Sequence, residues 1–138
     1  MKVFDEIKWF AQRGKRGWAD CDWWGMDYYL TSIIVPMLKE LKKHTHGHPG
    51  GISSLEEWKE ILNKMTLGFE ASKRIADCKN WVMNEGNEMF TDEKGYIQFK
   101  NPWTPEQIKN FKLLDKKDDK TYQDGMKLFS KWFLNLWD

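Results

Sequence analysis

Apolar residues recur at helical spacing near the start of the chain. Val3, Phe4, Ile7 and Phe10 fall one, three and three residues apart, which places them on one face of a helix. Two glycines interrupt the basic stretch that follows, at 13–17. The pattern therefore predicts a short first helix that ends before this stretch.

A second apolar stripe runs from residue 23 to residue 41 with a period of 3.6 residues. Its members are Trp23, Met26, Leu30, Ile33, Ile34, Met37, Leu38 and Leu41. Asp20 or Asp22 is placed to cap this helix at its N-terminus. Pro36 lies inside the pattern and lacks a backbone N–H, so we expect a kink or a split there.

Glycine and proline dominate residues 44–51, which predicts a loop. Ser54, followed three residues later by Glu57, is typical of a capping box that begins a third helix. The apolar stripe of that helix starts at Trp58 and predicts a helix that extends to about Val82.

The helical period is lost from residue 84 to residue 104. Two short apolar segments there flank a turn-like stretch at 91–95, which predicts a small β-hairpin near 88–100. Thr104 and Pro105 restart a helix that we expect to be short. The charged residues 115–120 then predict a solvated connection before a C-terminal helix with an aromatic face. The expected fold is mostly α: a compact bundle of about five helices in one domain, residues 1–138.

Composition excludes several classes of protein. The 22 Lys and Arg residues balance 21 Asp and Glu residues, so no basic field favours duplex nucleic acid. Two cysteines form no disulfide framework, and no apolar run is long enough for a leader or a membrane span. We therefore expect a soluble protein of a reducing cytoplasm. Nine Trp residues exceed what a core of this size readily buries.

The stretch from residue 13 to residue 24 combines the residue types that bind nucleotides. Arginine and lysine side chains beside a helix N-terminus favour a phosphate, tryptophans stack on bases, and aspartates accept hydrogen bonds from a guanine edge. The candidate ligand-binding residues here are Arg13, Lys15, Arg16, Trp18, Asp20, Asp22 and Trp24. The alternative is structural: a basic surface loop, a capping aspartate and core tryptophans. The stretch lacks the GxxxxGK[ST] pattern of a phosphate-binding loop.

Three histidines, His44, His46 and His48, alternate along the predicted loop. We include them as ligand-binding candidates, because imidazoles donate to phosphate or ribose oxygens. Alternate residues in a loop rarely converge on one metal ion, so we expect no metal and no cofactor. The remaining alternative is a set of exposed imidazoles with no ligand.

The two candidate sets lie at opposite ends of the second predicted helix. A straight helix over 22–43 is about 30 Å long, so the two ends do not meet within one protomer. Either the chain folds back at Pro36, or the two sets meet across a subunit interface. The second option predicts a homo-oligomer, with a tetramer as one form, whose ligand site is shared between subunits.

Three stretches of the chain also carry a resemblance. They read R-G-W-A-D-C-D-W-W-G-M-D-Y-Y-L at 16–30, H-T-H-G-H-P at 44–49 and L-F-S-K-W-F-L-N-L-W-D at 128–138. This succession resembles a widespread family of small phage proteins that includes anti-CBASS nucleotide sponges. The resemblance implies an oligomer in the cytoplasm of the infected bacterium. It also implies sequestration of cyclic dinucleotides such as 3′3′-cGAMP, without cleavage, to block CBASS immunity.

Two other functions compete with this expectation. A metal-dependent phosphodiesterase would use Asp20, Asp22 and the histidines, and it would destroy its ligand. A phage structural or host-protein-binding module would use exposed tryptophans as interface residues. No spacing in the chain favours a catalytic set over capping and burial, so an enzyme is not the expectation.

Overall fold

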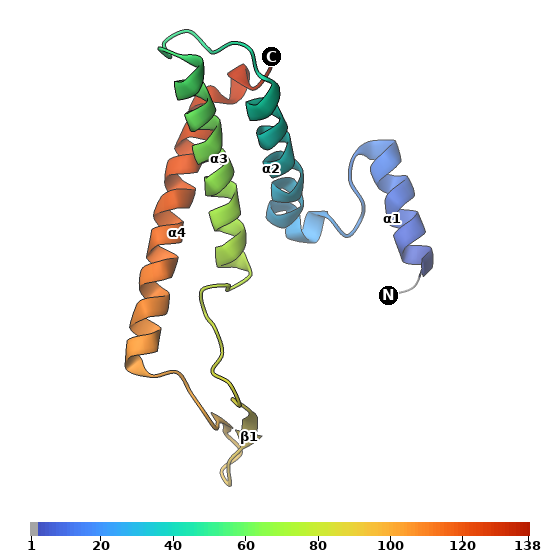
Figure 1. Cartoon of the computed structure of the whole chain (residues 1–138). Helices are drawn as coiled ribbons and strands as arrows, with labels where there is room; N and C mark the ends of the chain where they lie inside the picture. The colour runs from blue at the N-terminus through green and yellow to red at the C-terminus, as the bar shows by residue number, and fades with distance from the viewer. Residues whose placement is uncertain (1–2) are drawn as a thin grey trace.

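The structure, a computed structural model, describes residues 3–138 and is mostly helical (Figure 1). The helices are α1 (Val3–Arg16), α2 (Met26–His44), α3 (Leu55–Ala76) and α4 (Pro105–Trp132). Short 3-10 turns, η1 (Trp23–Gly25) and η2 (Phe133–Asn135), precede α2 and follow α4. Strands β1 (Met89–Thr91) and β2 (Ile97–Phe99) pair antiparallel and confirm the predicted hairpin.

Helices α3 and α4 approach each other at a pair of glycines. A Cβ atom added to Gly125 would lie 2.7 Å from the Gly68 Cα atom, and one added to Gly68 would lie 2.8 Å from the Gly125 Cα atom. Both distances are far inside van der Waals contact, so only glycine allows the two backbones to meet here. The crossing brings the aromatic ring of Phe69 to 5.0 Å from that of Phe129, edge to face.

The core lies on α3, which runs between α2 and α4 in Figure 1. Its buried apolar residues are Leu38, Ile52, Trp58, Leu62, Met65 and Phe69. Both neighbouring helices pack on α3, whereas α2 and α4 do not pack against each other along residues 3–138. The bundle therefore has three helices around one buried stripe, the stripe that the spacing of the third helix predicted.

Four helices form within the described chain, not five, because α4 continues through the charged segment 115–120. This segment is not a solvated connection. Asp118 is buried against α3, where its carboxylate accepts hydrogen bonds from Arg74 at 3.1 and 2.7 Å. Asn80 donates a third bond, at 2.8 Å. These hydrogen bonds replace the hydration that the Asp118 carboxylate loses on burial. Helix α4 therefore continues without a break through residues 115–120.

Helix α3 ends at Ala76 and does not reach Val82 as predicted. Cys78 takes a left-handed conformation, with φ of 52°, and turns the chain out of the helix. Trp81 then packs against Trp103 and Phe111, with ring centroids 5.2 and 5.3 Å apart. Aromatic contacts from outside α3 thus replace the last helical turn that the sequence pattern predicts.

The helix termini match the sequence in two places and differ in two. Ser54 and Thr104 cap α3 and α4 by accepting hydrogen bonds from the backbone N–H groups of Glu57 and Gln107. Neither Asp20 nor Asp22 caps α2, whose N-cap is Gly25 with no side-chain bond. Helix α2 continues through Pro36 from Met26 to His44, so the predicted split does not occur.

Helix α1 is longer than predicted and stands apart from the bundle. It continues through the basic stretch to Arg16 and ends at Gly17, whose φ of 85° favours glycine. Within residues 3–138, α1 packs against no other helix or strand and buries none of its residues (Figure 1). The chain is therefore less compact than the expected bundle. Among the described helices, none has both the length and the apolar composition to cross a membrane.

The glycine crossing makes a first prediction. Gly125→Ala should lower the free energy of unfolding by about 1–3 kcal/mol, because the new methyl group meets the backbone of α3 and neither helix is free to move aside. Urea denaturation measures the effect. Gly14→Ala is the matched control: Gly14 is also helical but has open space around it, so its substitution should stabilise α1 by about 0.5–1 kcal/mol. Equal stabilities for Gly125→Ala and the parent would contradict the tight crossing.

Candidate functional site

A bidentate ion pair joins the end of α1 to the linker before α2. The Arg13 guanidinium donates from Nε and Nη2 to the two carboxylate oxygens of Asp22, at 2.9 and 2.6 Å. Asp22 is buried and also accepts a hydrogen bond from the Ala19 backbone N–H at 2.7 Å. Parallel N–H···O bonds of this kind combine strength with a fixed geometry. Arg13 and Asp22 therefore hold the α1–α2 junction in one arrangement.

Asp20 forms a second set of contacts on the same junction. Its carboxylate accepts a hydrogen bond from Gln12 at 2.7 Å and pairs with Arg16, while Lys8 lies 3.3 Å away. The Gln12 side chain accepts in return from the Asp20 backbone N–H at 2.9 Å. Neighbouring side chains of α1 thus bond to the same linker, which fixes the path of the linker although it has no regular structure.

The junction encloses an aromatic hollow of about 430 Å³, which we call the junction hollow. Its lining residues are Arg16, Gly17, Trp18, Asp22, Trp23, Met26, Tyr29, Leu30 and Ile33. The Arg16 guanidinium lies 3.9 Å from the centre of the Trp18 ring, a cation–π arrangement. The Tyr29 hydroxyl donates to the Gly17 carbonyl at 2.7 Å and so connects the start of α2 to the end of α1.

The two aspartates remain ionised over most of the pH range. Hydrogen bonds from Gln12 and Arg16 lower the pKa of Asp20 to about 2, and the bond from Arg13 lowers the pKa of Asp22 to about 2. Asp22 in turn raises the pKa of Arg13. Burial raises the pKa of the Cys21 thiol, which lies against Asp22 and not against a histidine. The thiol is thus neutral near pH 7, unlike an activated nucleophile.

The structure brings most of the predicted Arg, Trp and Asp residues together, but with different partners. Arg13 and Arg16 bond to aspartates, whereas Lys15 forms no ion pair with the part of the chain that is described. Trp23 lines the junction hollow and Trp24 lies outside it, packed edge to face on Trp23. The carboxylate groups of the two aspartates are therefore already bonded to arginines in the chain without a ligand.

Four residues of α2 line the hollow without having been predicted as site residues: Met26, Tyr29, Leu30 and Ile33. Their spacing of three, one and three places them on one face of α2. That spacing is visible in the sequence, but three of the four belong to the stripe predicted to face the core. Only the position of α1 decides that this face lines a hollow.

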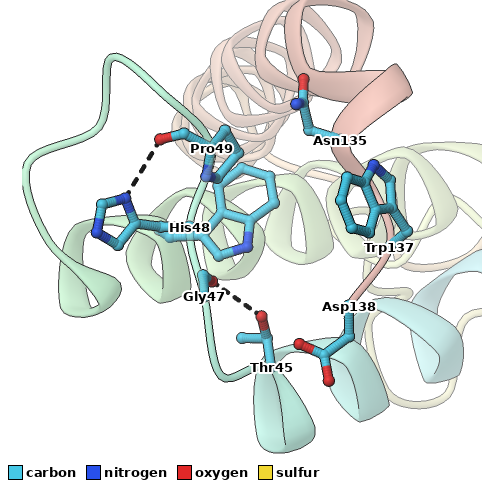
Figure 2. A pocket seen from close by; sticks show the side chains of 8 residues that line it. Thr45, Gly47, His48, Pro49, Asn135, Trp137 and Asp138 are labelled. Carbon is cyan, nitrogen blue, oxygen red and sulfur yellow. Dashed lines mark hydrogen bonds between the residues drawn. The ribbon is translucent and has the colours of Figure 1, made fainter.

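The histidines lie at the other end of α2, about 28 Å away for a 19-residue helix. His44 lies 3.1 Å from Glu40, and His46 lies 3.2 Å from the Asp138 carboxylate. His48 turns toward the Pro49 carbonyl (Figure 2). The three imidazoles contact different partners and do not converge. Throughout residues 3–138, no three His, Cys, Asp or Glu side chains are grouped to hold a metal ion.

A second, smaller hollow of about 140 Å³ lies beside the histidine loop. Figure 2 shows it between the loop residues Thr45, Gly47 and His48 and the C-terminal residues Trp137 and Asp138. The Asp138 carboxylate accepts a hydrogen bond from the His46 backbone N–H at 3.0 Å, which ties the loop to the last residues of the chain. This hollow is too small for a nucleotide and is separate from the junction hollow.

Comparison with known proteins adds no assignment: no family model, curated protein or solved structure matches the chain.

The paired aspartates predict a specific loss of stability in acid. Their pKa values of about 2 lie below the ordinary 3.8, so their contribution is complete above about pH 4 and is lost as pH falls toward 2. Asp22→Asn should therefore flatten the dependence of the unfolding free energy on pH between about 5 and 2. Urea denaturation at a series of pH values tests this. Asp5→Asn, which removes an exposed carboxylate on α1, should retain the slope of the parent. Identical slopes for Asp22→Asn and the parent would contradict the role of the pair.

Proposed function

We propose that this protein binds a cyclic dinucleotide such as 3′3′-cGAMP in the junction hollow and sequesters it without cleaving it, as a phage protein that blocks CBASS immunity. The observation that carries the proposal is the junction hollow itself: Trp18, Trp23 and Tyr29 line it, with the Arg16 guanidinium at its edge. Aromatic rings beside a cation are the groups that hold a base and its phosphate.

The size of the hollow supports a ligand as large as one nucleotide. Its volume of about 430 Å³ falls in the range of roughly 300–1,000 Å³ typical of small-molecule sites. Trp18 and Trp23 are 43% and 60% exposed, so base stacking would bury apolar surface that the free chain leaves in water. Stacking on such rings contributes about 1–3 kcal/mol per base.

The phosphate would be held by Arg16 and Lys15. A guanidinium has five N–H donors, and the bonds of Arg16 to the Trp18 carbonyl and to Asp20 use two of them. Lys15, one residue earlier at the end of α1, is exposed and supplies a second charge. Arg13 has a positioning role in this proposal, because its guanidinium bonds to Asp22.

A cyclic dinucleotide has two bases, and we propose that a second copy of the chain completes the site. His44, His46 and His48 enter the proposal only through that copy, since they lie about 28 Å from the hollow along their own α2. Sequestration needs no catalytic group, and the carboxylates of Asp20 and Asp22, on which the phosphodiesterase alternative depends, pair with Arg16 and Arg13. The site is therefore proposed to act by affinity.

Capture and release test this proposal directly. The protein is mixed with a panel of cyclic and linear nucleotides, separated from unbound ligand and denatured by heat, and the supernatant is analysed by chromatography. We expect one cyclic dinucleotide to be recovered intact in stoichiometric amount. An altered product would indicate a phosphodiesterase, and retention of no nucleotide from the panel would contradict the proposal.

Two tryptophans of the stretch 13–24 give a matched pair of variants. Trp18→Ala removes a ring that lines the hollow and should weaken binding roughly 5- to 150-fold, the equivalent of about 1–3 kcal/mol for one stacked base. Trp24→Ala removes a ring of the same size that lies outside the lining and should bind like the parent. Titration calorimetry measures both. A larger loss for Trp24→Ala than for Trp18→Ala would place the ligand elsewhere.

A further inference from the structure

Helix α1 has an apolar face that nothing within residues 3–138 covers. Val3, Phe4, Ile7 and Phe10 lie on this face and are between 61% and 83% exposed. The opposite side of the helix carries mostly polar and charged side chains together with Trp9, so α1 is amphipathic. An isolated helix of 14 residues is marginal in water, and a helix with such a face is usually stabilised by packing against a partner.

The bundle has a groove with the complementary character. Because α2 and α4 pack on α3 and not on each other, two adjoining hollows of about 440 and 510 Å³ lie between them. Both are lined by Ile34 of α2 and Phe129 of α4, so they form one continuous feature, which we call the α2–α4 groove. Leu30, Met37, Met126 and Phe133 make up further parts of its apolar lining.

The groove and the helix agree in length. On α2 the groove runs from Asp27 to Leu41, which is about 21 Å at 1.5 Å per residue. Helix α1, with 14 residues, is also about 21 Å long. The groove therefore has the dimensions of one missing helix, and a fourth helix there would complete a four-helix bundle.

The junction holds α1 away from the groove of its own chain. Arg13 and Gln12 of α1 bond to Asp22 and Asp20 of the linker, and Tyr29 of α2 bonds to Gly17. For α1 to enter its own groove, the linker would have to rearrange and these bonds would break. A second copy can supply its α1 with all of them intact.

We propose that α1 of one copy lies in the α2–α4 groove of a second copy, and that the exchange is reciprocal. Charged residues determine in which direction the incoming α1 lies along the groove. Asp27 and Asp119 lie at the end of the groove where α2 begins, which favours Lys15 at the C-terminal end of the incoming helix. The acidic first turn of α1 then lies near the basic last turn of α2, so the two helices are antiparallel.

The surface area that the two exchanged helices would bury is sufficient for a stable dimer. The two phenylalanines of one α1 bury roughly 150–250 Å² each when covered, and Val3 and Ile7 add to this. With the groove surface included and the contact made twice, the total is on the order of 1,500–2,000 Å². Stable interfaces bury about 1,200–2,000 Å², so two exchanged helices suffice.

The exchange also bears on the junction hollow. Leu30 lines both the hollow and the groove, so an α1 seated in the groove lies next to the proposed ligand site. The dimer itself does not depend on any ligand, and its test uses the protein alone. Loss of the dimer and loss of nucleotide capture are therefore separate results.

Sedimentation velocity over a range of concentrations tests the exchange. The parent should be an oligomer. Phe10→Asp on α1 and Met37→Asp in the groove should each raise the dissociation constant by more than about 100-fold, because each buries an unpaired carboxylate. Met37 is 65% exposed in the free chain, so the second variant should fold, and circular dichroism verifies this. Leu113→Asp is the control, because Leu113 is an exposed apolar residue of α4 that lies outside the groove lining, and it should leave association unchanged.

Mixing the two variants distinguishes reciprocal exchange from an interface at another surface of the molecule. A Phe10→Asp chain retains a normal groove, and a Met37→Asp chain retains a normal α1, so their mixture should form heterodimers with one intact contact. A parent that is monomeric at all concentrations would overturn the proposal. Association that neither substitution changes, or a mixture with no recovery, would also overturn it, because the interface would then lie elsewhere.

Discussion

The contact between Gly68 and Gly125 is the constraint on which the rest of the fold depends. With no side chain on either residue, the backbones of α3 and α4 meet, and the long helix α4 lies along α3 over much of its length. The contact also brings Asp118 within reach of Arg74, and this buried pair lets the charged middle of α4 remain helical. Helix α3 thus becomes the centre of the bundle, with α2 on its other side.

This arrangement leaves much of the apolar surface uncovered. Helix α3 covers one face of α2 and one face of α4, and the neighbouring faces of both helices line an open groove. Of the nine tryptophans, Trp58 is the one that the described chain buries fully. Part of the surplus aromatic surface that composition indicated lies at three places: the junction hollow, the α2–α4 groove and the apolar face of α1. The first is the proposed ligand site, and the other two are proposed to cover each other. Trp24, Tyr96 and Trp137 are exposed outside these places.

The α1–α2 junction shows how ion pairs change the meaning of a basic motif. In the sequence, Arg13 and Arg16 near Asp20 and Asp22 indicate separate contacts to phosphate and base. In the structure, the opposite charges satisfy one another, and their pairing fixes the position of α1. The aromatic hollow exists because of that position. Arg13, Asp20 and Asp22 are thus proposed to serve nucleotide binding indirectly, by holding Trp18 and Tyr29 around one space, whereas Arg16 is proposed to contact the phosphate as well.

The sequence by itself determined most of the local structure. Helical spacing located α1, α2, α3 and the C-terminal part of α4. Serine and threonine caps located the starts of α3 and α4, and two apolar segments around a turn located the hairpin. These signals depend on neighbours within a few residues. The extent of α4 and the end of α3 needed contacts with Arg74 and Trp103, which lie far away in the chain. The sequence also named Arg16, Trp18 and Asp22, which line the candidate site. Only the tertiary structure decided that Trp23 and Tyr29 line the hollow, that the histidines lie at the far end of α2, and that α1 is unpartnered. Those outcomes depend on how whole helices are placed, and helix placement is set by long-range packing at points such as Gly68 and Gly125, which residue spacing does not encode.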